Sequence, residues 1–185
     1  MRVITGKAKG MKLKMPKGGY TRPVMDRVKE ATFNIIAHET PGGRFLDLFA
    51  GAGNLGIEAL SRGAASAVFV DLARECTQTI KENLRHTKLE ENAEVYGMDC
   101  LKFLKQFKFN EPFDVVFIDP PYLKGFLEPI LEYLPESSNF TENTLFIIER
   151  QKKDDLSLES RPEYILTDER KFGDTILTFF KLKKV

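Results

Sequence analysis

A glycine-rich turn between a buried strand and a helix restricts the fold of this chain more than any other feature of its sequence. The apolar run 44–49 leads into Gly51, Gly53 and Gly56, which have G-x-G-x-x-G spacing, and helical spacing continues to Ser61. In nucleotide-binding α/β units the first glycine permits a tight turn, the second lets a ligand approach the backbone, and the third lets the helix pack closely on the sheet. Glycine-rich turns also occur where a strand simply packs against a helix, so the motif indicates nucleotide binding only if the surrounding sequence supports it.

The surrounding segments alternate between strand-like and helical patterns. Further strands are predicted at residues 67–70, 93–96, 113–118 and 144–148, and helices at residues 54–61, 75–87, 100–107 and 126–134. Such alternation implies right-handed crossovers, so we expect an α/β fold with a mostly parallel sheet and helices on both faces. Two last strand-like runs, 163–166 and 175–181, have no helix between them and should form an antiparallel hairpin at one edge of the sheet.

Positive charge is concentrated at the amino terminus. The 185 residues fit one domain with a small appendage, and the formal net charge is +1. Residues 1–30 nevertheless carry a net charge of +7 and the remaining 155 residues carry −6. We divide the chain into a basic arm, residues 1–24, with a small hairpin between 2–5 and 11–13, and a main domain, residues 25–185, which opens with a helix after Pro23. On charge alone, the arm is equally compatible with a surface that binds a polyanion and with a solubilising tail.

Several classes of protein are poor fits to the composition. The two cysteines, Cys76 and Cys100, and the two histidines, His38 and His86, are isolated from one another, so no metal site and no Ser-His-Asp hydrolase is expected. No apolar run is long enough to span a bilayer, and no amino-terminal secretory signal is seen. We therefore expect a cytoplasmic protein that needs neither a metal nor a membrane.

Acidic side chains lie at the carboxyl ends of three successive predicted strands, where ligands of open α/β sheets bind. Asp71 ends the second strand, 20 residues after Gly51, and is expected to bind a ribose diol; its alternative role is to cap the next helix. Asp47 is poorly placed beside a pyrophosphate but suits an ammonium group, which favours S-adenosylmethionine over a dinucleotide. Asp99 is equally compatible with accepting a hydrogen bond from an adenine amino group and with capping the helix at Leu101.

The motif Asp119-Pro120-Pro121-Tyr122 directly follows the fourth predicted sheet strand. Pro-Pro removes two backbone donors and fixes a stiff turn, so neighbouring carbonyls stay free to accept hydrogen bonds. A carboxylate plus a rigid carbonyl can hold the two N–H bonds of an exocyclic base amine and direct its lone pair at an electrophilic methyl group. Tyr122 offers a ring for stacking on an extruded base. Taken alone, the motif is also compatible with a stiff loop that makes an aromatic core contact.

The same motif matches the [D/N]PP[Y/F] pattern of amino-methyltransferases that act on nucleic-acid bases. Over nearly its whole length the chain resembles the RsmD family of bacterial small-subunit ribosomal RNA guanine-N2 methyltransferases. The resemblance is carried by residues 4–6, 9–10, 21–23, 26–31, 33–35, 46–64, 70–71, 81–83, 114–122 and 172–175.

This resemblance implies a Rossmann-like class I methyltransferase fold with an antiparallel C-terminal hairpin. It implies methylation of the exocyclic N2 of a guanine in 16S ribosomal RNA, within the small ribosomal subunit or its assembly intermediate, with no obligate protein partner. S-adenosylmethionine would be the cofactor and S-adenosylhomocysteine the product. The catalytic residues would be Asp119, Pro120, Pro121 and Tyr122. The cofactor-binding residues would be Asp47, Ala50, Gly51, Gly53, Gly56, Asp71, Leu72, Asp99 and Cys100. The RNA-binding residues would be Lys7, Lys9, Lys12, Lys14, Lys17 and Arg22.

Three other functions compete with this one. An adenine-N6 methyltransferase acting on DNA or RNA would use the same fold and the same motif. An NAD-dependent oxidoreductase would explain the glycines and Asp71, but it leaves the Asp-Pro-Pro-Tyr motif and the basic arm without roles. A non-catalytic RNA-binding module would not need an intact Asp119 motif.

Overall fold

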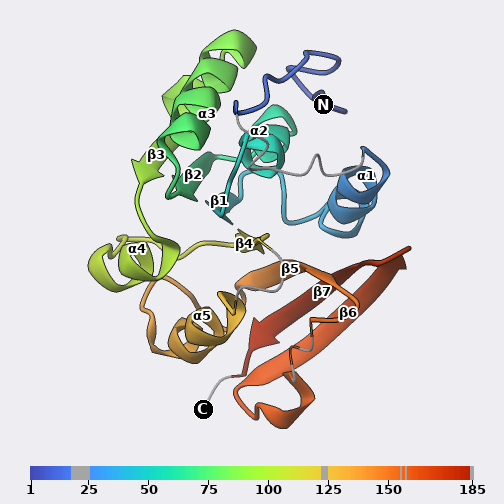
Figure 1. The fold of residues 1–185 in the computed structure, drawn as a ribbon, viewed down its shortest axis with the longest axis vertical. Coiled ribbons are helices and arrows are strands. Elements are labelled where there is room, and N and C mark those ends of the chain that lie inside the picture. The colour runs from blue at the N-terminus through green and yellow to red at the C-terminus, as the bar shows by residue number, and fades with distance from the viewer. Residues whose placement is uncertain (18–25, 122–124, 155, 157, 184–185) are drawn as a thin grey trace.

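The computed structural model describes residues 1–17, 26–121, 125–154, 156 and 158–183, and one seven-stranded sheet runs through them (Figure 1). The strand order is β3-β2-β1-β4-β5-β7-β6. The five strands from β3 to β5 are parallel, whereas β7 is antiparallel to both β5 and β6. The strands are β1 Arg44–Leu48, β2 Ser66–Asp71, β3 Ala93–Gly97, β4 Val115–Ile118, β5 Leu145–Gln151, β6 Tyr164–Phe172 and β7 Thr175–Leu182.

Helices cover both faces of the sheet, as the strand–helix alternation predicts. On one face lie α1, α2 and α3, and on the other α4 and α5 (Figure 1). The helices are α1 Asp26–Ile35, α2 Asn54–Ser61, α3 Arg74–Thr87, α4 Cys100–Gln106 and α5 Leu127–Tyr133, and short 3₁₀ turns span Glu90–Asn92, Leu134–Glu136 and Leu158–Ser160. Within the described residues, no helix is both long and apolar enough to cross a membrane.

Alternating side chains of the buried strands divide the core into two layers. Phe45, Phe69 and Phe117 face α1, α2 and α3, whereas Leu46 and Val116 face α4 and α5. This alternation follows from the two-residue period of a strand, and it lets a strand buried on both faces read as a continuous apolar run.

The closing hairpin is antiparallel, as expected, but β6 is longer than the predicted run 163–166. It extends to Phe172 and contains a bulge between Leu166 and Asp168. The additional residues are mostly charged, and charged side chains on an exposed edge strand discourage pairing with another chain. A prediction based on apolar runs therefore stops too early.

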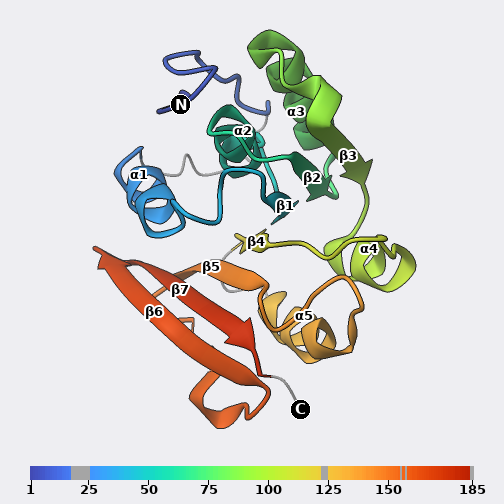
Figure 2. The ribbon, with the colours of Figure 1, turned by 180° about the vertical axis from the view of Figure 1, so that it is seen from behind.

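The amino-terminal residues pack against the body. Val3, Ala8 and Leu13 are buried in the layer that α2 contributes to, and both views show this segment beside α2 (Figures 1 and 2). The expected hairpin is reduced to a single antiparallel bridge between Arg2 and Lys12. The predicted boundary at residue 24 and the helix start at Pro23 lie outside the described residues.

A buried ion pair fastens this segment to the body. The Lys29 ammonium lies 3.0 Å from the Glu58 carboxylate, and both side chains are completely buried. Glu58 also accepts hydrogen bonds from the backbone N–H groups of Ile4 and Thr5, at 2.8 and 3.0 Å. Burial lowers the pKa of Lys29, and Glu58 partly offsets this shift. Lys29, which is counted in the positive charge of residues 1–30, is thus paired with Glu58 inside the protein and adds nothing to the exposed basic surface.

Candidate active site

The glycine-rich turn joins β1 to α2 and has the backbone that its sequence predicts. Gly51 and Gly53 have φ angles of 56° and 76°, in the left-handed region that favours glycine. A side chain on Gly56 would place its Cβ 2.3 Å from the Phe69 ring, so only glycine lets α2 approach β2 this closely. The Ala50 N–H donates to the Val70 carbonyl at 3.0 Å, which ties the turn to β2.

Asp47 lies beneath this turn. Its Oδ2 accepts a hydrogen bond from the Gly56 N–H at 3.0 Å, and the residue is only 2% exposed. The pKa of Asp47 is raised to about 7, because burial outweighs the opposing hydrogen bond from Gly56 and the negative charge of Asp71 adds to the rise. Asp47 therefore organises the start of α2 and is poised between its neutral and charged forms near neutral pH.

Asp71 holds the turn from the end of β2. Its Oδ2 accepts a hydrogen bond from the Gly51 N–H and its Oδ1 accepts one from the Ala73 N–H, both at 2.8 Å. Burial raises the pKa of Asp71, and these two hydrogen bonds oppose the shift. Ala73 is the N-cap of α3, so Asp71 serves the start of that helix as well as the glycine-rich turn. The next residue, Leu72, keeps 72% of its surface exposed beside this carboxylate.

Asp99 caps α4. Its Oδ1 accepts a hydrogen bond from the Lys102 N–H at 2.9 Å, which is the helix-capping alternative weighed from the sequence, and its side chain is exposed. The neighbouring Cys100 thiol is buried and free, and burial raises its pKa to about 12. Within the described residues, no three His, Cys, Asp or Glu side chains are grouped so as to hold a metal ion.

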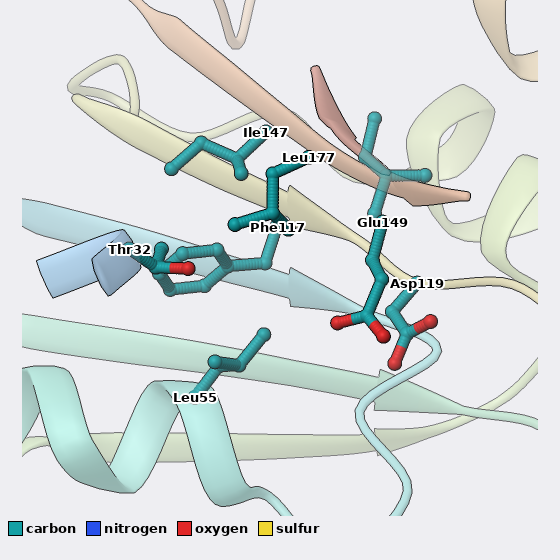
Figure 3. Close-up of a pocket in the computed structure, with 8 residues that line it drawn as sticks. Thr32, Leu55, Phe117, Asp119, Ile147, Glu149 and Leu177 are labelled. Atoms are coloured by element: carbon teal, nitrogen blue, oxygen red, sulfur yellow. The ribbon is translucent and has the colours of Figure 1, made fainter. Parts of the chain in front are cut away.

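Asp119 follows β4 directly and, with Glu149 of β5, lines a small pocket (Figure 3). The two carboxylates lie side by side at one end of the pocket, and the buried side chains of Phe117, Ile147 and Leu177 line the rest of it. Burial raises the pKa of Asp119 well above its usual range, and the negative charges of Glu149 and then Asp47 add to the shift. Pro120 is buried and Pro121 is exposed, while Tyr122 lies outside the described residues.

Strand register places four carboxylates on one face of the sheet. Asp47 pairs with Phe69 on β2 and with Phe117 on β4, so Asp71 and Asp119, two residues further on, project to the same side. Ile118 pairs with Ile148, which makes Glu149 the direct neighbour of Asp119. The carboxyl ends of β2, β1, β4 and β5 thus form an acidic edge, made of Asp71, Asp47, Asp119 and Glu149. The sequence predicts the first three, whereas Glu149 requires the pairing of two strands.

The amino-terminal lysines form an exposed basic surface. The side chains of all the described candidates, Lys7, Lys9, Lys12, Lys14 and Lys17, are exposed, and Arg22 lies outside the described residues. Lys14 forms an ion pair with Glu82 at 2.9 Å. Asn83 links this surface to the glycine-rich turn, because its Nδ2 donates to the carbonyls of both Lys14, at 3.0 Å, and Ala52, at 2.9 Å. The sequence offers no local signal for this role of Asn83.

Comparisons with known proteins show what the whole chain is similar to. The profile of a family described as Conserved hypothetical protein 95 matches residues 1–181. Ribosomal RNA small subunit methyltransferase D of Haemophilus influenzae is 39% identical over 153 residues, which cover 82% of this chain and 79% of that protein. YlbH of Bacillus subtilis is 39% identical over 182 residues, 98% of either chain. The solved structure of yhhF from Escherichia coli has a TM-score of 0.85 and 32% identity, and the match covers 99% of this chain and 98% of that one.

Proposed function

Since this chain belongs to the RsmD family, whose profile matches residues 1–181, we propose that it methylates ribosomal RNA of the small subunit at the exocyclic N2 of a guanine. The sheet is that of a Rossmann-like class I methyltransferase, with its antiparallel C-terminal hairpin. The observation that carries the proposal is the position of Asp119-Pro120-Pro121. This segment leaves β4 at the same sheet edge as the glycine-rich turn, and Asp119 lies beside Glu149 of β5.

The chemistry of the edge fits S-adenosylmethionine as the cofactor. Asp71 uses one acceptor site on each oxygen for the backbone, and an ionised carboxylate has further lone pairs for a ribose diol. Exposed Leu72 beside it supplies apolar surface for an adenine ring. Asp47 places negative charge under the turn, where an ammonium group would favour the ionised carboxylate. When bound, S-adenosylmethionine supplies an electrophilic methyl group.

The protein's part of the reaction is mainly positioning. Asp119 accepts a hydrogen bond from the exocyclic amine, and the carbonyls beside the Pro-Pro segment accept the other, so the amine nitrogen is oriented for attack. An ordinary aspartate is too weakly basic to accept the proton that this nitrogen gives up. The raised pKa of Asp119 makes it a more effective base for that proton.

The exposed lysines of the amino-terminal segment supply affinity for the RNA backbone. Lysine ammonium groups bind phosphates without reading sequence, and such binding weakens as salt rises. The segment is anchored by buried Val3, Ala8 and Leu13, so its lysines are presented on a firm surface. We expect the substrate to be 16S ribosomal RNA within the small subunit or its assembly intermediate.

Product identification tests the proposal. Small subunits, naked ribosomal RNA and plasmid DNA are each incubated with isotope-labelled S-adenosylmethionine, digested to nucleosides and analysed by mass spectrometry. N2-methylguanosine from RNA is the expected product, and Asp119→Ala should lower its rate by about 100-fold or more. Label in N6-methyladenine would favour the adenine-N6 alternative, and undiminished activity of Asp119→Ala would contradict the assigned role of Asp119.

A further inference from the structure

The pair of carboxylates at the ends of β4 and β5, Asp119 and Glu149, provides more hydrogen-bond acceptors than methyl transfer itself requires. A single acceptor beside the Pro-Pro carbonyls is enough to hold an exocyclic amine. Here Glu149 adds a second carboxylate next to that of Asp119, and it comes from a different strand (Figure 3). Glu149 is only half-buried, so part of its side chain stays accessible to a base that is held beside Asp119.

Two adjacent carboxylates restrict which hydrogen-bonding groups a ligand can present to them. Ionised carboxylates only accept hydrogen bonds, and two that lie close together in a poorly solvated site repel each other. The effect of Glu149 on the pKa of Asp119 shows that the two groups interact. A ligand that presents two neighbouring donors relieves this repulsion, whereas a ligand that presents an acceptor to one of them adds to it.

The purine bases differ in this respect along the edge that a flipped base shows to an active site. Guanine presents N1–H and the N2 amine as neighbouring donors. Adenine presents its N6 amine next to N1, which is an acceptor. Enzymes that act on extruded bases read this edge by hydrogen bonds. Guanine therefore matches a carboxylate pair, and adenine places a lone pair against one of the two carboxylates.

We propose that Glu149 is a specificity-determining residue that accepts the N1–H of the target guanine while Asp119 accepts an N2–H. The inference rests on the proposed function and extends it, because the Asp-Pro-Pro motif by itself does not separate guanine from adenine.

A base analogue separates this role from a structural one. 2-Aminopurine keeps the amine at C2, but its N1 is an acceptor. Ribosomal RNA that carries either guanine or 2-aminopurine at the mapped position is given to the wild type, to Glu149→Gln and to a matched control, Glu91→Gln. The control changes an exposed residue in the turn before β3, and three strands separate β3 from β5 in the sheet. Methyl transfer and the midpoint of thermal unfolding are measured for each protein.

The wild type and Glu91→Gln should prefer guanine by about 10- to 100-fold in kcat/KM. In Glu149→Gln the side chain can donate to the N1 of 2-aminopurine, so we expect the preference to fall at least about 10-fold, with unchanged thermal unfolding. If the wild type makes N2-methylguanosine but Glu149→Gln keeps the same preference, the inference is wrong and the proposed function stands. If Glu149→Gln does not fold, the wild type decides the question: equal kcat/KM for guanine and 2-aminopurine would also show that the inference is wrong. A wild type that makes no N2-methylguanosine would overturn both.

Discussion

Replacing the buried carboxyl group under the glycine-rich turn should make the protein less sensitive to pH. Burial raises the pKa of Asp47 from 3.8 to about 7 in the folded state. The folded protein therefore binds the Asp47 proton more tightly than the unfolded chain does. Its contribution to stability is fully present below about pH 4 and is lost as the pH rises through about 7. The difference in pKa corresponds to about 4 kcal/mol.

Asp47→Asn removes this titration and keeps an oxygen that can accept the Gly56 N–H. The free energy of unfolding of the variant, relative to wild type, should rise by about 4 kcal/mol between pH 4 and pH 8. In a chain of this length that is a relative gain of about 8–16 °C in unfolding midpoint. Loss of the Asp47 charge also lowers the pKa of Asp119, which acts in the same direction.

Urea unfolding followed by circular dichroism at several pH values measures this difference. Asp99→Asn is the matched control, because asparagine also caps helices and the Asp99 side chain is exposed. The reasoning is refuted if the difference between Asp47→Asn and wild type stays constant from pH 4 to pH 8 within about 1 kcal/mol. Calorimetry adds a binding test: S-adenosylhomocysteine should bind wild type more tightly as the pH rises toward 7, and this pH dependence should be absent from Asp47→Asn.

Three further outcomes are expected. Glu58→Leu, which leaves the Lys29 ammonium buried without its carboxylate, should cost about 3–5 kcal/mol in urea unfolding, whereas Glu82→Leu at the exposed pair should stay close to wild type; equal effects would contradict the anchoring role. Gly56→Ala should lower stability by about 1–3 kcal/mol and weaken cofactor binding in calorimetry, whereas Gly97→Ala, whose added Cβ makes ordinary contacts, should do neither. Replacing the three exposed lysines Lys7, Lys9 and Lys12 by alanine should lower the log–log slope of RNA affinity against salt by about two to three, measured by fluorescence anisotropy. Cofactor binding should not change. An unchanged slope would show that the basic surface does not bind RNA.

Much of the fold follows from local patterns. Buried parallel strands read as apolar runs, and helices between them force the crossovers, so the order of layers is predictable from the spacing alone. The acidic residues Asp47, Asp71 and Asp119 are also predictable, because Asp47 lies near the carboxyl end of the first such run, Asp71 and Asp119 directly follow later runs, and the carboxyl ends of parallel strands meet at one edge.

The amino-terminal segment shows where local patterns fail. Its lysines are exposed as their charge predicts, but Val3, Ala8 and Leu13 are too widely spaced to match a helical or a strand period. Their burial depends on α2, more than 40 residues away, and on the Glu58 carboxylate, which accepts hydrogen bonds from the backbone N–H groups of Ile4 and Thr5. A count of charges therefore predicts the exposed lysines of this segment correctly, but it does not predict that the segment packs against α2.

Glu149 marks a different limit of sequence reasoning. It sits within a strand and has no motif around it, so only the pairing of Ile118 with Ile148 brings it beside Asp119. A register shift of one residue would turn its side chain to the opposite face of the sheet. The specificity proposed for the site thus depends on long-range strand register, whereas the amine-binding motif depends on four consecutive residues.

Because acidic and basic side chains occupy different surfaces of the structure, the phosphate backbone and the target base of the proposed RNA substrate should bind at different places. The acidic edge repels RNA phosphates and accepts only donor groups, so the backbone gains nothing by approaching it. Exposed charges separated by more than about 8 Å are largely screened at physiological salt, so the attraction must act at close range. The lysines of the amino-terminal segment meet this need, since Asn83 joins the backbone of Lys14 to that of Ala52 in the glycine-rich turn. The basic surface can therefore hold the backbone near the site while the donor edge of a single extruded base enters it.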